Sequence, residues 1–231
     1  MKYEFDAIGH ISSPFKEKFG IPRQSGLVPE ARASLVFDSP YNRAEAIAGL
    51  EGYSHLWIQF VFHQAMRGEW QPMVRPPRLG GNEKVGVFAS RSPFRPNPIG
   101  LSVARLEGVS TSAGQVELLL SGLDLVDGTP VLDVKPYVVY SDSIPDASSG
   151  FAPSAPEKRL EVVFSQRALE QIQARADSEQ LQALIAALLE IDPRPAYRSG
   201  ESGDRIYGIR LYDFDLRWRV TGEQVEVLEL A

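Results

Sequence analysis

Short runs of β-type residues, each bounded by turn residues, fill the first two-thirds of the chain and constrain its fold more than any other feature. The runs cover residues 4–12, 33–38, 55–63, 85–89, 101–107, 116–120 and 131–140. Seven such strands predict a closed or nearly closed antiparallel sheet, and the strand–helix alternation of a parallel doubly wound sheet is missing. Only one short helix is expected among them, with Asn42 as the N-cap of a turn that runs towards Gly49.

Two of these runs differ in how their apolar residues are distributed. The run HLWIQFVFH at residues 55–63 is apolar on both faces, which predicts a central strand buried on both sides. The run that begins at Val131 alternates, so that Asp133, Lys135 and Tyr137 share one face. That face is therefore available for function.

A segment rich in Pro, Ser and Ala, IPDASSGFAPSAP at residues 144–156, separates two different patterns and is interpreted as a linker. After it, Ser165 is placed to be the N-cap of a helix, and Leu or Ile residues at helical spacing predict a second helix that Asp192-Pro193 should end. Strands are expected at residues 160–164, 214–220 and 225–230. The sequence thus predicts a mainly β chain, with an antiparallel β-barrel domain at residues 1–155 and a smaller α+β domain at residues 156–231.

Composition excludes several kinds of chemistry. Cysteine is absent, which rules out disulfides, thiolate nucleophiles and Cys-ligated metal sites. No stretch approaches the roughly 18 apolar residues of a membrane span, and the first ten residues hold no apolar signal segment, so a cytoplasmic protein without membrane contact is expected.

The net charge of −6 is unevenly distributed along the chain. Residues 64–105 hold seven Lys or Arg and two acidic residues, whereas residues 106–192 hold five and fourteen. A basic segment on an otherwise acidic protein predicts local binding of phosphates, and the alternative is a chance cluster on a solvated loop.

The loop RSPFRPNPIG, residues 91–100, carries three prolines that forbid a helix and stiffen its backbone. Arg91 and Arg95 on such a loop suit bidentate recognition of a carboxylate or phosphate. A purely structural loop, with its arginines packed against backbone carbonyls, is the equal alternative. Two further loops rich in Pro, Gly and cations, residues 15–26 and 73–84, are possible binding segments or plain surface.

Metal and nucleotide motifs give no support to other enzyme classes. His55 and His63 face the same way, but eight residues at about 3.3 Å each place them roughly 26 Å apart, so one metal ion cannot contact both. The sequence contains no H-E-x-x-H, G-x-G-x-x-G or G-x-S-x-G motif. Asp124, Asp127 and Asp133 suggest acid–base work, or else a turn at Asp127 and an ion pair between Asp133 and Lys135.

Four long segments carry a family resemblance. IGHISSPFKEKFGIPRQ, SHLWIQFVFHQ, RPPRLGGNEKVGVFASRSPFRPNPIGLS and LDLVDGTPVLDVKPYVVYSDSIPDA resemble the TrmO family, also called TsaA-like or YaeB-like tRNA methyltransferases. DPRPAYRSG and DFDLRWRV are similar to the appended domain of its full-length bacterial members. The resemblance implies a homodimeric β-barrel that binds S-adenosyl-L-methionine without a Rossmann fold. It also implies methylation of N6-threonylcarbamoyladenosine in tRNA, just 3′ of the anticodon.

The family's pattern implies a set of cofactor contacts: Gln24, Ser25, Gly26, His63, Gln64, Arg91, Leu101, Leu132, Asp133, Val134 and Lys135. Every one of these residues precedes the linker, so residues 1–155 are expected to bind the cofactor alone. No metal is expected, because methyl transfer from a sulfonium needs alignment more than covalent catalysis. The acceptor nitrogen must lose a proton, for which His63, Asp133 and Tyr137 are candidates.

Candidate contacts to tRNA are cations near aromatic residues: Arg67, Arg95, Arg198, Arg217 and Arg219, with Arg194, Arg205, Tyr197, Tyr207 and Trp218 beside them. The competing interpretation for the second domain is that Trp218 belongs to the core and the arginines next to it are simply solvated. Two other functions stay open at this point. A non-catalytic RNA-binding module would not need the cofactor, and a regulatory protein would bind the cofactor without transferring its methyl group.

Overall fold

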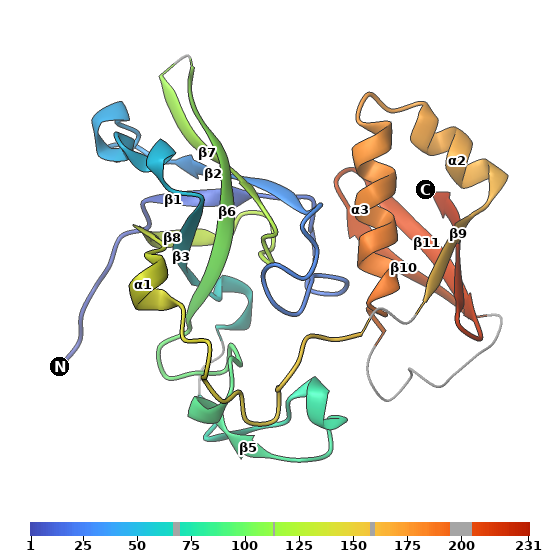
Figure 1. The fold of residues 1–231 in the computed structure, drawn as a ribbon, viewed down its shortest axis with the longest axis horizontal. Coiled ribbons are helices and arrows are strands. Elements are labelled where there is room, and N and C mark those ends of the chain that lie inside the picture. Colours follow the sequence, from blue (N-terminus) through green and yellow to red (C-terminus); the bar gives the residue numbers. More distant parts are fainter. Residues whose placement is uncertain (67–69, 113, 158–159, 195–204) are drawn as a thin grey trace.

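A computed structural model of the chain describes residues 1–66, 70–112, 114–157, 160–194 and 205–231. Six antiparallel strands close into a barrel in the order β1-β2-β7-β6-β3-β8 (Figure 1). They are β1 (Gly9–Ser12), β2 (Arg32–Phe37), β3 (His55–Val61), β6 (Ile99–Ser112), β7 (Gln115–Ser121) and β8 (Pro130–Pro136). The expected mainly β, antiparallel barrel is confirmed.

Several local expectations about this part of the chain were wrong. The run at residues 85–89 is no barrel strand, because it lies in a Pro- and Gly-rich loop: β5 (Val85–Gly86) pairs only with β4 (Met73–Val74). Asn42 caps no helix; its side chain donates to the Gly114 carbonyl at 3.1 Å instead. The final run ends as a strand at Pro136, which has no N–H to donate, and α1 (Val139–Asp142) follows.

Short 3₁₀ turns occupy several barrel connections: η1 (Ala44–Ile47), η2 (Leu50–Gly52), η3 (His63–Ala65), η4 (Pro77–Leu79) and η5 (Val87–Ala89). The barrel core consists of the inward side chains, such as Ile11, Leu35 and Ile58, which are fully buried. β3 is flanked by β6 and β8, but its alternate residues His55, Trp57 and Gln59 are half-exposed. It was expected to be buried on both sides; a barrel strand instead buries only its inner face.

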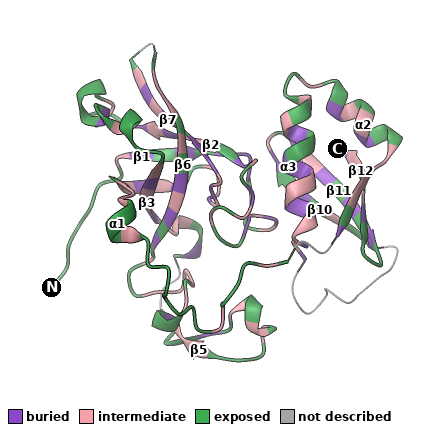
Figure 2. Ribbon diagram, viewed as in Figure 1, coloured by how far each residue is buried: buried purple, intermediate pink, exposed green. Residues whose placement is uncertain are grey.

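The second part of the chain is an α+β unit, as the sequence predicts. Its sheet has the order β10-β11-β12-β9, with β9 parallel to β12 and the other pairs antiparallel. Its elements are β9 (Glu161–Phe164), α2 (Gln166–Gln173), α3 (Ser178–Glu190), β10 (Ile206–Leu211), β11 (Phe214–Thr221) and β12 (Gln224–Leu230). The strands and helices bury their facing sides (Figure 2). No helix in the described ranges is long and apolar enough to cross a membrane.

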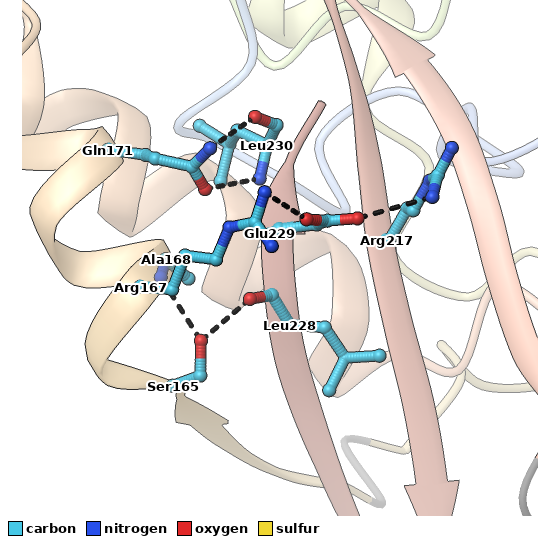
Figure 3. Close-up of polar contacts among 8 residues, drawn as sticks. All are labelled: Ser165, Arg167, Ala168, Gln171, Arg217, Leu228, Glu229 and Leu230. Atoms are coloured by element: carbon cyan, nitrogen blue, oxygen red, sulfur yellow. Dashed lines mark hydrogen bonds and ion pairs between the residues drawn. The ribbon is translucent and has the colours of Figure 1, made fainter.

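Polar contacts fix α2 to the last strand of this sheet (Figure 3). Ser165 caps α2 as expected, because its hydroxyl oxygen accepts from the Ala168 N–H at 3.1 Å. The side-chain amide of Gln171 bonds both backbone groups of Leu230, at 2.7 and 2.9 Å. Glu229 lies between the guanidinium groups of Arg167 and Arg217, at 2.8 and 3.2 Å. These contacts attach β12 to α2 on one side and to Arg217 of β11 on the other.

The two cores do not divide at the linker. The core of the α+β unit contains Trp218 and the apolar face of α3, but also Phe15, Val28 and Ala31 from the loop between β1 and β2. We call residues 13–31 the first loop. It leaves the barrel, packs into the core of the C-terminal unit, and returns to β2 (Figure 1).

Candidate active site at one end of the barrel

Three connections that carry the predicted site residues leave the same end of the barrel. They are the first loop, the long β3–β6 connection at residues 62–98, and the β7–β8 turn at residues 122–129. The strand registers require this placement, because Val61 pairs with Ile99, His10 with Pro130 and Arg32 with Ser121. The antiparallel order thus brings together segments that are far apart in sequence.

The tip of the first loop contacts both of the other connections. The Arg91 guanidinium donates to the Gln24 side-chain oxygen at 2.6 Å, and both side chains are exposed. The Gly26 N–H donates to the Gly122 carbonyl at 2.8 Å. Gly26 has a φ of +78°, and a Cβ placed on it would meet no atom within 4 Å. The predicted contacts Gln24, Gly26 and Arg91 therefore lie together around open backbone.

Asp124 is the partly buried charge at this junction. Its Oδ1 accepts from the Ser102 hydroxyl at 2.6 Å, and both the Arg91 guanidinium and the Ser25 backbone N–H favour its charged form. Burial is the largest influence and raises the pKa of the Asp124 carboxyl above its ordinary value, although these donors and Arg91 act in the opposite direction. The carboxylate links the first loop to β6.

The sequence analysis did not select Asp124 over its two neighbouring aspartates. A usable signal was present, because Leu123 and Leu125 on either side are buried in the barrel core. An acidic residue between two core leucines lies at the edge of an apolar region. Burial there shifts the pKa of its carboxyl group, and such shifts mark candidate functional residues.

His63 and Gln64 lie at the end of β3, beside the first loop. The preceding N–H, of Phe62, donates to the Pro98 carbonyl at 2.8 Å, which holds the start and the end of the β3–β6 connection together. The Lys18 ammonium of the first loop donates to the Gln64 carbonyl. The His63 ring is half-buried. Both predicted residues therefore belong to the same end of the barrel as Arg91.

Leu101 and Asp133 lie in one row across the outer face of the barrel, because both pair with Gln59 of β3. Leu101 is half-exposed, and the Asp133 carboxylate bonds the Lys135 ammonium at 2.6 Å and the Val134 N–H at 2.9 Å. The expected Asp133–Lys135 ion pair is thus present. Leu132 and Val134, the other members of this strand segment, are partly exposed. This row runs across three neighbouring strands on the outer wall of the barrel, near the end from which the loops leave.

Tyr137 follows the end of β8, at the opposite end of the barrel, where its N–H donates to the His55 carbonyl at 3.0 Å. Its ring packs against Trp57 at 5.7 Å and His55 at 6.3 Å between centroids. Arg95 turns back on its own loop, where its Nη1 donates to the Ser90 carbonyl at 2.7 Å and its guanidinium lies 5.7 Å from the centre of the Phe88 ring. This is the contact with backbone carbonyls that the structural alternative predicts for Arg95.

The arginines of the C-terminal unit have varied surroundings. Arg198 and Tyr197, like Arg67 of the β3–β6 connection, lie outside the described residues. Arg217 pairs with Glu229, and Arg219 pairs with Glu226 at 2.7 Å. Trp218 is fully buried, as the competing interpretation predicted, and Arg194 is also buried against Asp192 at 2.8 Å. Exposed cations on β11 are thus limited to those already paired with glutamates.

Metal ligation finds no support in the described ranges, which hold no group of three or more His, Asp or Glu side chains arranged to hold an ion. The arrangement at the barrel end is instead one of single, separated polar groups on three connections. Its charged groups include the exposed Arg91 and Lys18, the partly buried Asp124, and the Lys16–Asp127 ion pair at 2.7 Å, and the backbone at Gly26 is open. Such a site suits the binding of an organic ligand with charges of both signs.

Comparison with known proteins identifies the family. Residues 10–143 match the tRNA-methyltransferase O N-terminal domain, and residues 157–231 match the TrmO C-terminal domain. The chain belongs to the TrmO family. The resemblance drawn from its motifs is therefore confirmed, and it extends over both TrmO domains.

Relatives in the TrmO family match the chain over nearly its whole length. A tRNA (adenine(37)-N6)-methyltransferase of Escherichia coli is 52% identical over 229 residues, which cover 99% of this chain and 97% of that protein. A putative S-adenosylmethionine-dependent methyltransferase of Pseudomonas aeruginosa, RcsF, is 48% identical over 236 residues, covering 100% and 99%. A crystal structure of TrmO superposes with a TM-score of 0.80 at 42% identity and covers 100% of both chains.

Proposed function

We propose that this chain methylates N6 of adenine 37 in tRNA with S-adenosylmethionine as the methyl donor, and that its acceptor is N6-threonylcarbamoyladenosine. The observation that carries the proposal is the match to the Escherichia coli tRNA (adenine(37)-N6)-methyltransferase over 99% of the chain. The name of the Pseudomonas aeruginosa relative supports the cofactor. The threonylcarbamoyl group is the finer part of the proposal and needs its own test.

The barrel end has groups that fit this cofactor. S-adenosylmethionine carries a carboxylate, an ammonium, a sulfonium and an adenine ring. The exposed Arg91 guanidinium matches the carboxylate, and the partly buried Asp124 carboxylate matches the cationic groups. Leu101 offers exposed apolar surface, and the open backbone at Gly26 leaves room for close approach. The proposed cofactor contacts are therefore those that the family pattern implies, with Asp124 added.

The chain's own residues supply alignment. The cofactor, when bound, provides a methyl group on a positively charged sulfur, and transfer is an in-line displacement that depends on the relative position of donor and acceptor. Arg91 is held to Gln24, and Asp124 to Ser102, so both charges have fixed positions before a ligand arrives. Pre-positioned charges lose little freedom on binding, which favours a defined orientation of the ligand.

A proton must leave the acceptor nitrogen, which its carbonyl substituent makes more acidic. We assign its acceptance to an imidazole nitrogen of His63, since the other two candidates are engaged elsewhere. Asp133 pairs with Lys135, and Tyr137 packs between aromatic rings away from the loops. His63 is at the end of β3, where the first loop reaches the β3–β6 connection through Lys18.

The acceptor can be tested by comparing one tRNA prepared with and without the threonylcarbamoyl group. The group carries a free carboxylate, and loss of a charge-assisted hydrogen bond to it costs about 1.5–3 kcal/mol, roughly tenfold to a hundredfold in rate. Transfer of labelled methyl to each tRNA, followed by nucleoside analysis, gives both rates. Equal rates would remove the threonylcarbamoyl requirement while leaving adenine 37 methylation standing.

The same assay separates the alternatives. Label bound to protein but absent from nucleosides indicates a regulatory cofactor-binding protein, and tRNA binding without cofactor binding indicates an RNA-binding module. Arg91→Ala and Arg95→Ala then divide the roles of the two loop arginines. Weaker cofactor binding identifies the cofactor contact, and lost discrimination between the two tRNAs identifies the carboxylate contact.

We assign methyl transfer to the barrel domain, residues 1–155, and assistance in tRNA binding to residues 156–231. Arg217 and Arg219 are the proposed phosphate contacts of this second domain. Each guanidinium is about half-exposed, so it can reach a phosphate when it leaves its ion pair with a glutamate. Arg67 and Arg198 complete the proposed tRNA contacts. A homodimer in the cytoplasm is also proposed, and light scattering of the purified protein tests its mass.

A further inference from the structure

The first loop contacts the β10 edge of the C-terminal sheet. Phe15 forms a β-bridge with Leu211, and the Tyr212 N–H donates to the Pro14 carbonyl at 2.8 Å. The Glu17 carboxylate accepts from the Arg210 N–H at 2.9 Å. Backbone and side-chain hydrogen bonds thus attach the start of the loop to the edge of this sheet.

Apolar packing also attaches the loop to the C-terminal unit. Phe15 is 2% exposed within the C-terminal core, and the partly buried Phe19 ring stacks on Trp218 at 6.2 Å with an interplanar angle of 10°. Gly20 has a φ of +84°, and a Cβ there would lie 2.5 Å from the Ile209 side chain. The loop backbone thus approaches β10 more closely than a side chain would permit.

Anchors on the C-terminal unit bracket the tip that carries Gln24, Ser25 and Gly26. Before the tip, the exposed Arg23 guanidinium donates to the Arg194 carbonyl at 3.1 Å. After it, Val28 and Ala31, each 1% exposed, return to the same core. The tip itself contacts the barrel connections through the bonds to Arg91, Gly122 and Asp124.

We infer that the C-terminal unit completes the cofactor site, and that Phe19 and Arg23 are positioning residues that hold the tip against the barrel end. The inference rests on the proposed function, because it takes the tip as a cofactor contact. It replaces the expectation that residues 1–155 bind the cofactor alone. Without the C-terminal unit, Phe15, Val28 and Ala31 lose their core, and the tip loses both of its anchors.

The test compares two Phe→Ala variants of the full chain. Phe19 and Phe164 are both partly buried against the same core, but Phe164 lies on β9, at the opposite edge of the sheet from β10. If Phe19→Ala reduces the ordered population of the tip to about a tenth, calorimetry with S-adenosylmethionine should show a roughly tenfold higher Kd. Phe164→Ala should stay within about twofold of the unsubstituted chain.

Kinetics and a conservative variant separate positioning from general damage. Phe19→Ala should raise KM for S-adenosylmethionine and leave KM for tRNA unchanged, and Phe19→Tyr, which keeps the stacked ring, should restore both values. If Phe19→Ala does not fold, Arg23→Ala serves instead, because Arg23 is exposed and loses one hydrogen bond, for about a fivefold higher Kd. Arg43→Ala, another exposed arginine, is its control.

The outcomes distinguish this inference from the function on which it rests. An unsubstituted chain that binds no S-adenosylmethionine contradicts the proposed function itself. If that chain binds, and both Phe19→Ala and Arg23→Ala bind equally well, the C-terminal unit does not position the tip. Selective weakening by these two variants, with their controls unaffected, supports the inference.

Discussion

Replacement of Asp124 by Asn tests whether the barrel end is built for binding rather than for stability. The substitution keeps the size and shape of the side chain but removes its charge. In the folded chain the carboxylate accepts from the Ser102 hydroxyl at 2.6 Å, and the Ser25 N–H favours its charged form. An amide offers one acceptor oxygen, so a donor is left facing its NH₂ group unless the side chain moves.

The expected loss in binding follows from that contact. One hydrogen bond to a charged group contributes about 1.5–3 kcal/mol, and each 1.4 kcal/mol is about tenfold in Kd. Because the Asp124 carboxylate is a proposed contact of the cofactor's cationic groups, removal of its charge should appear in the affinity for S-adenosylmethionine. We expect the Kd of Asp124→Asn to rise roughly tenfold or more.

Stability should change in the opposite direction. Burial raises the pKa of the Asp124 carboxyl above its ordinary value. Between the ordinary and the raised pKa, the folded chain keeps a proton that the unfolded chain has lost, so the free energy of unfolding falls as pH rises through this acidic window. Above it, the ionised carboxylate opposes folding by a constant amount, which Asp124→Asn removes.

The assay is therefore a pair of measurements on one variant: calorimetric titration with S-adenosylmethionine at neutral pH, and denaturant unfolding from neutral to acidic pH. The expected result is weaker binding together with equal or greater stability and a smaller pH dependence in the acidic window. Unchanged affinity with a clear loss of stability would refute the reasoning, because Asp124 would then be a structural residue of the barrel.

Two further substitutions test the packing around the site. Asp192→Ala leaves the Arg194 guanidinium, which is 2% exposed, without its bidentate partner, and should lower the free energy of unfolding by about 3–5 kcal/mol; a denaturant midpoint equal to that of the unsubstituted chain would contradict this. Gly100→Ala places a Cβ 2.2 Å from the Phe60 ring inside the barrel, and a cost of about 1–3 kcal/mol is expected by the same measurement, with exposed Gly52→Ala as the control.

The barrel was predictable because its strands leave a local signal. Alternation in β1, β2 and β7 and the turn residues between them specify antiparallel strands, and an antiparallel sheet of this size closes to remove its edges. Once the barrel is closed, the register brings the three connections to one end without further information. The proximity of Gln24 to Arg91 follows from that register, although 67 residues separate them.

Residue environments at the site were less predictable, because they depend on contacts that have no local pattern. Arg91 and Arg95 are four residues apart on one stiff loop, and the residue pattern of that loop does not distinguish their environments. The structure leaves Arg91 exposed and turns Arg95 onto the Ser90 carbonyl. Likewise, the desolvation of Asp124 depends on how closely the first loop covers it, which only the folded chain defines.

The linker is the domain boundary that the sequence predicts, but the two hydrophobic cores of the folded chain divide at a different place. Residues 144–156 separate barrel strands from helices, whereas Phe15, Val28 and Ala31 cross that division and are buried in the second core. FKEKFGIPRQSG was interpreted as a possible binding segment or plain surface, and its apolar residues have no period that would predict their packing against a distant sheet edge. Because the first loop is anchored in the core of the second domain, that domain becomes a structural part of the first domain's binding site. The two TrmO domains are then expected to function as one unit, with the affinity for cofactor set partly by residues that never touch it.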